Sequence, residues 1–205
     1  MTGSIFQEER DANSNLLALL LKQMSFNLVK IILEDLESPY KVKYCTGALL
    51  DASYGGHYEF ARLLLEMGAD VNGQNEGRGN AVRAASFSGH RDVVQLLLDN
   101  GAEINALNGG FGNALRAASY NGHVEIIRLL LSRGADVNAQ GGKYGNALRA
   151  ASMAGHREAV ELLLTNGADI NAKGGKTLTA LGVAEQEGHQ DIARLLLKEG
   201  ANTSL

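Results

Sequence analysis

The sequence is poor in cysteine, in proline and in long apolar runs. Its 205 residues include one cysteine, Cys45, which cannot form an internal disulfide, so the chain is typical of a reducing compartment. The early apolar run 16–21 is too short to span a bilayer, and acidic residues precede it where a secretory signal would carry basic ones. We therefore expect an intracellular protein, cytoplasmic or nuclear, that makes no membrane contact.

An excess of basic residues is also missing. The chain has 19 Lys and Arg against 23 Asp and Glu, a formal net charge of −4. Nucleic-acid binders usually carry a concentrated basic face, so we do not expect a nucleic-acid partner. Apolar residues make up 45% of the chain, which is enough for a packed core and argues against wholesale disorder.

What the sequence has in abundance is an internal repeat. A Gly-His pair recurs every 33 residues, with its histidine at positions 57, 90, 123, 156 and 189. A Gly-Ala pair recurs with the same step, its glycine at positions 68, 101, 134, 167 and 200. No insertion breaks this register, so the chain is a repeat array.

One unit of the repeat predicts two helices. Asn113 is a good N-cap for a short helix of small residues, 114–120, and Gly122 can end it in the left-handed conformation. A second helix, rich in Ile and Leu, is expected at about 124–132, followed by a polar, glycine-rich linker. Because small side chains let first helices approach closely, the stack should curve with these helices on the inside.

These units resemble the ankyrin repeat. The family's Thr-Pro-Leu-His motif corresponds to residues 113–116 and to the stretches that begin at 80, 146 and 179, with Asn for Thr, Ala for Pro and Arg for His in most copies. The Gly-Ala-Asp-Val-Asn stretch at 134–138 matches the family almost residue for residue. The sequence around it is similar to the ankyrin arrays of filamentous fungi. The resemblance covers about 43–202. It implies an all-α solenoid of stacked helix–turn–helix units with hairpin-like linkers, curved around a concave groove.

The chain divides accordingly into a tail, a cap and five repeats. We expect a flexible N-terminus at 1–14 and a degenerate capping repeat at 15–42, in which Pro39 forbids continuation of a preceding helix. The five regular repeats are expected at about 43–75, 76–108, 109–141, 142–174 and 175–205.

Motifs for catalysis or for cofactor binding are missing. Stacked helices lie roughly 8–10 Å apart, too far for histidines of neighbouring repeats to share a zinc ion that needs each nitrogen at about 2 Å. We expect the histidines to fix the turns between helices instead. The glycine-rich run 109–112 lacks the lysine of a phosphate loop, and neither a nucleophile elbow nor a metalloprotease pattern appears. We therefore expect no cofactor, no metal and no enzymatic activity.

Large side chains stand two residues before the Gly-His pairs, where the core does not demand them. We name this set the aromatic row: Tyr54, Phe87, Tyr120 and Met153. Three further aromatics, Tyr44, Phe111 and Tyr144, are expected near the linker tips. Because tyrosine offers a large amphipathic contact area, these residues predict a binding surface.

An arginine row should lie beside the aromatic row. It consists of Arg83, Arg116 and Arg149, each four residues before a member of the aromatic row and hence on the same helix face. Such a surface suits an acidic partner with apolar segments. Asp51 stands where later repeats have alanine, and we expect it to pair with Arg83. Alternatively, the arginines hydrogen-bond the adjacent repeat's backbone, as the family's histidine does, and the aromatics pack against linkers.

Three functions remain open at this point. The first is binding of another protein or peptide in the concave groove by a monomeric chain. The second is a small-molecule-binding protein or an enzyme of fungal metabolism, in which the arginine row would hold a carboxylate and a tyrosine or Asp51 would move protons. The third is an array from a larger receptor that only spaces or senses.

Overall fold

A computed structural model describes residues 38–74, 79–107, 112–141, 145–173 and 178–203. The expected flexible N-terminus and most of the degenerate capping repeat lie outside the described residues.

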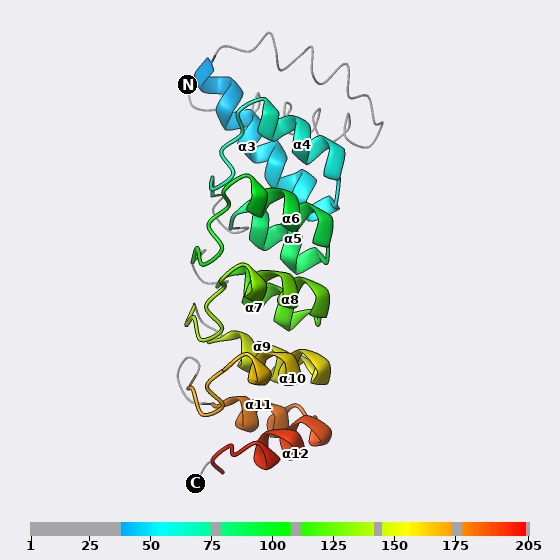
Figure 1. Cartoon of the computed structure of the whole chain (residues 1–205), viewed down its shortest axis with the longest axis vertical. Helices are drawn as coiled ribbons and strands as arrows, with labels where there is room; N and C mark the ends of the chain where they lie inside the picture. The colour runs from blue at the N-terminus through cyan, green and yellow to red at the C-terminus, as the bar shows by residue number, and fades with distance from the viewer. Residues whose placement is uncertain (1–37, 75–78, 108–111, 142–144, 174–177, 204–205) are drawn as a thin grey trace, which may run out of the picture.

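The described residues form ten helices, which pair into two-helix repeats stacked along the long axis of the molecule (Figure 1). The first helices of the pairs are α3 (Ser38–Gly55), α5 (Ala81–Ser88), α7 (Ala114–Tyr120), α9 (Ala147–Ala154) and α11 (Ala180–Gln186). The second helices are α4 (Tyr58–Glu66), α6 (Arg91–Asp99), α8 (Val124–Ser132), α10 (Arg157–Thr165) and α12 (Gln190–Lys198). The linkers lie along one edge of the stack (Figure 1). The predicted all-α solenoid is confirmed.

Capping residues explain why the four helices α5, α7, α9 and α11 begin where they do. The side chain of Asn113 accepts a hydrogen bond from the backbone N–H of Arg116 at 2.9 Å, which satisfies a donor that has no partner within the helix. Asn80, Asn146 and Thr179 do the same for their own helices. The helices expected at 114–120 and 124–132 have these bounds in the structure.

The core lies between the two helix layers and runs the length of the stack. Leu64, Leu97, Leu130, Leu163 and Leu196 from the second helices are all fully buried. The first helices of neighbouring repeats contact each other more extensively than the second helices do. Their alanines permit this close approach, and the difference supports the expected curvature with the first helices on the inside.

The first helix of the described residues, α3, differs from the others. α3 has 18 residues and runs through residue 43, where we had expected a boundary between the cap and the first repeat. Pro39 lies in the first turn of α3. Proline is tolerated there because backbone N–H groups of the first turn have no partner within the helix, so the N–H that proline lacks is not missed. The helix that Pro39 was expected to follow lies outside the described residues.

Asparagines join neighbouring linkers into a ladder. Asn138 donates from Nδ2 to the carbonyl of Gly167 at 3.0 Å and accepts from the backbone N–H of Asp169 at 2.7 Å. Asn105 makes the same pair of contacts one repeat earlier, and Asn72 makes it two repeats earlier. These residues belong to the stretch that we had interpreted only as a turn-favouring linker.

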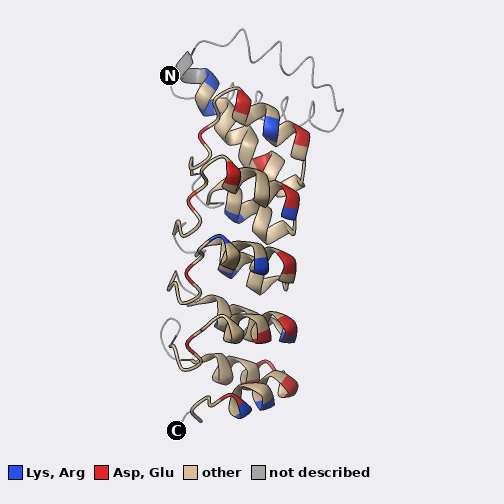
Figure 2. Ribbon diagram, in the orientation of Figure 1, with Lys and Arg blue, Asp and Glu red and all other residues tan. Residues whose placement is uncertain are grey.

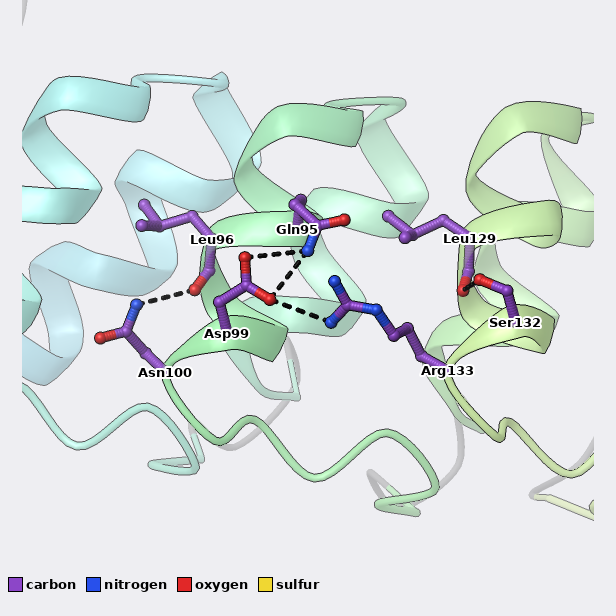
Figure 3. Close-up of polar contacts among 7 residues, drawn as sticks. All are labelled: Gln95, Leu96, Asp99, Asn100, Leu129, Ser132 and Arg133. Carbon is purple, nitrogen blue, oxygen red and sulfur yellow. Dashed lines mark hydrogen bonds and ion pairs between the residues drawn. The ribbon is translucent and has the colours of Figure 1, made fainter.

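Many of the charged residues lie on the second helices and along the linkers (Figure 2). Some of them connect repeats: Arg133 reaches Asp99 of the preceding repeat at 3.0 Å (Figure 3). Among the helices of the described residues, none has the length and apolar character needed to cross a membrane.

Candidate functional site

The aromatic row occupies the ends of four successive first helices. Tyr54 and Tyr120 are the exposed members, with 54% and 41% of their surface accessible. Phe87 and Met153 are half-buried. The row therefore presents tyrosine rings to solvent from α3 and α7, with a partly covered side chain after each.

Rings of the first two repeats stack on each other. The centroids of Tyr54 and Phe87 are 6.4 Å apart and their planes differ by 17°, an offset stack of the kind that aromatic pairs prefer. The guanidinium carbon of Arg83 lies 6.0 Å from the centroid of Phe87, within the range of a cation–π interaction. The i, i+4 spacing expected to bring arginine and aromatic together does so at this position.

Histidines of the following repeat contact the backbone of three members of the aromatic row. The Nε2 atom of His90 lies 3.1 Å from the carbonyl oxygen of Tyr54, His123 bears the same relation to Phe87, and His189 to Met153. A carbonyl oxygen can only accept, so Nε2 carries the proton and donates.

The same histidine rings lie against the glycines of the preceding Gly-His pairs. A Cβ atom on Gly89 would come within 2.7 Å of the His123 ring, closer than real side chains approach. We had expected the histidines to fix their own turns. The structure adds that they also lock each repeat to the one before. Among the described residues no group of three or more His, Cys, Asp or Glu is placed to hold a metal ion.

The arginine row is more deeply placed than helix spacing alone indicated. Arg116 keeps only 8% of its surface exposed, and Arg83 and Arg149 are half-buried. Burial lowers the pKa of Arg83 and of Arg149 from the ordinary arginine value. The stem of Arg116 lies over Gly112, where an added Cβ would meet its Cδ at 2.9 Å. These side chains therefore contribute to the scaffold as well as to the surface.

The remaining expected site residues have different outcomes. Tyr44 was expected near a linker tip, but it lies inside α3 and is half-buried, because α3 extends through the residues that form a linker in later repeats. Phe111 and Tyr144 lie outside the described residues. Asp51 is exposed on α3, and its pairing with Arg83 stays a prediction.

Leu107 is an exposed apolar residue of a linker that the sequence analysis did not identify. Leu107 stands in a linker with 54% of its surface accessible, and its Cδ2 would be 3.1 Å from a Cβ on Gly141. The equivalent positions in other repeats are polar: Gln74, Gln140 and Lys173. This break in the pattern was the signal that could have identified it.

The helix pairs, interlocked by histidines at one edge and asparagines at the other, define an all-α repeat solenoid. A family model described as Ankyrin repeats (3 copies) matches residues 16–108, 82–174 and 115–205. The matches overlap and extend over most of the sequence, so the chain belongs to the ankyrin-repeat family. None of the curated proteins searched matches the chain. Ankyrin repeats generally serve as protein–protein interaction modules and are typically not enzymes.

Proposed function

We propose that the chain binds another protein through the aromatic row. The observation that carries this proposal is the exposure of two tyrosines at the same position of two repeats. Tyr54 has 54% and Tyr120 has 41% of its surface accessible to solvent, and neither ring belongs to the buried core. Large amphipathic rings aligned on one face offer contact area at a small cost in side-chain entropy, since a tyrosine has only two rotatable side-chain bonds.

The arginine row supports a partner with acidic groups beside its apolar anchors. Arg83 and Arg149 are only half-buried, and a carboxylate that approaches the row would find a guanidinium within the same helix face. Burial of Arg116 reduces its share in such a contact. We also propose that the chain is monomeric and intracellular, and that its repeats are related to the ankyrin arrays of filamentous fungi.

The test is a pull-down from an extract of the source organism with the full chain as bait. The informative variant is Tyr54→Ala/Tyr120→Ala, because both rings are exposed and their loss should leave thermal unfolding nearly unchanged. Phe87→Ala is less informative, since Phe87 is half-buried and supports Tyr54.

Leu197→Ala is the matched control. Leu197 is a comparably exposed apolar residue, at 42%, but lies on α12 and away from the aromatic row. We expect the partner to bind the wild type and Leu197→Ala and to be lost with the double variant. Retention by the double variant would contradict the proposal. A captured carboxylate-bearing small molecule in place of a protein would favour the alternative of a small-molecule site.

A further inference from the structure

The aromatic row differs between its two ends. At the N-terminal end Arg83 lies over the ring of Phe87, and Phe87 in turn stacks on Tyr54 of the preceding repeat. At the other end Arg149, the equivalent of Arg83, precedes Met153, which has no aromatic face for a cation. The same arginine position therefore stands four residues before an aromatic ring in one repeat and four residues before a thioether in another.

We propose that Arg83 is a positioning residue of this surface, which holds Phe87 in the orientation on which Tyr54 stacks. The inference rests on the proposed binding role of the aromatic row and identifies the residue that orders it. A guanidinium is drawn to the negative face of an aromatic ring, and the i, i+4 spacing keeps the two groups on one side of α5. Arginine also retains its charge under partial burial, so the attraction persists.

The backbone at both rings is fixed independently of Arg83. His90 donates to the carbonyl of Tyr54 and His123 donates to the carbonyl of Phe87. The orientation of the two side chains is not set by these backbone contacts, and the stack with Arg83 restricts it. A surface ordered before its partner arrives loses less conformational entropy on binding.

The test needs no partner, because it observes the rings of the full chain directly. In Arg83→Met the charge is removed while an unbranched stem is kept. We expect nuclear Overhauser contacts between the Tyr54 and Phe87 rings to be present in the wild type and lost in Arg83→Met. Arg149→Met is the matched control and should retain them. Arg83→Lys should restore part of their intensity, because it returns a cation to the ring face.

Contacts that persist in Arg83→Met would overturn the inference. So would their loss in Arg149→Met, since that would indicate a general loosening of the stack. If Arg83→Met does not fold, Arg83→Gln is judged by the same criteria. Once a partner has been captured, its affinity should fall roughly two- to fivefold in Arg83→Met, as expected for one cation–π contact. If the row binds nothing the proposed function fails, while the ring contacts still decide the role of Arg83.

Discussion

The hydroxyl oxygen of Thr46 accepts a hydrogen bond from the backbone N–H of Asp70 at 2.9 Å. In the asparagine ladder a side-chain oxygen accepts a hydrogen bond from the backbone N–H at the corresponding position of a later linker, so Thr46 takes the place of a ladder asparagine at the first linker. The position that corresponds to the ladder asparagines, one repeat before Asn72, is Pro39 within α3. Thr46 also places its methyl group where a Cβ on Gly73 would stand. Later repeats have alanine at that position, so Thr46 and Gly73 form a matched pair.

We expect Gly73→Ala to destabilise the chain by about 1–3 kcal/mol, the usual cost of overpacking. In a Thr46→Ser background most of this cost should disappear, because serine keeps the hydroxyl and lacks the methyl group. Urea unfolding of the two single variants and the double variant gives the coupling free energy. Additive single effects would show that the two residues do not share this space.

A comparison of alanine variants at Gly89 and Gly101 distinguishes the cost of backbone strain from the cost of losing the histidine contact. Both have a positive φ, 87° and 86°, but a Cβ on Gly101 would meet open space whereas one on Gly89 would meet the His123 ring. Gly101→Ala should cost about 1–2 kcal/mol, from strain alone. Gly89→Ala should cost about 1 kcal/mol more, because the ring must shift and its hydrogen bond to Phe87 is lost. Equal midpoint shifts in chemical unfolding would argue against the lock between repeats.

The carboxyl group of Asp99 should titrate below the usual aspartate range. Hydrogen bonds from Gln95 and then from Arg133 hold the pKa of Asp99 down (Figure 3). A lowered pKa contributes stability above the ordinary pKa of the unfolded chain, and this stability is lost as the pH falls through the folded value. The contribution should be small, because the group is exposed.

NMR titration of Asp99 in Gln95→Ala and in Arg133→Ala tests both contributions. Each variant should move the pKa of Asp99 back towards its ordinary value, because each removes a group that stabilises the carboxylate. Only the effect of Arg133→Ala should weaken at high salt, since the contact it removes is an ion pair. An unchanged pKa in Gln95→Ala would be the contrary result.

Buried serines of the first helices offer a stabilising substitution. Ser86 is fully buried, and among the described residues its hydroxyl has no hydrogen-bond partner. Ser119, at the same repeat position, donates to the carbonyl of Leu115 at 2.7 Å. Ser86→Ala should therefore be neutral or raise stability by up to about 1 kcal/mol, whereas Ser119→Ala should lower it by about 0.5–1.5 kcal/mol. Thermal unfolding that ranks the two variants in the opposite order would show that Ser86 is satisfied in solution.

The sequence predicts the regular repeats closely because their signals are local. The N-cap Asn113 and the glycine turn after α7 stand within a few residues of the helix ends that they set. The alignment of Arg83 with Phe87 was likewise available from helix spacing. Repetition then extends such local rules along the whole array.

What escaped the sequence analysis depends on contacts between repeats. His90 and Tyr54 are 36 residues apart, and no periodicity within one unit indicates that the imidazole reaches back to that carbonyl. Helix spacing gives the face of Arg116 but not its depth, which the neighbouring linker determines. The placement of Tyr44 was wrong because α3 replaces a linker, and only the tertiary structure reveals that exchange.

The two sets of contacts between repeats have a mechanical consequence. His123 reaches back to Phe87 at the turn edge, while Asn138 reaches forward to Gly167 at the linker edge. Each repeat is thus hydrogen-bonded to its immediate neighbours at both edges of the stack, and these contacts do not extend to more distant repeats. Tension along the axis should therefore peel the chain open one repeat at a time, in steps of nearly equal length. A partner anchored along several repeats would act as a splint and raise the force at which the first step occurs.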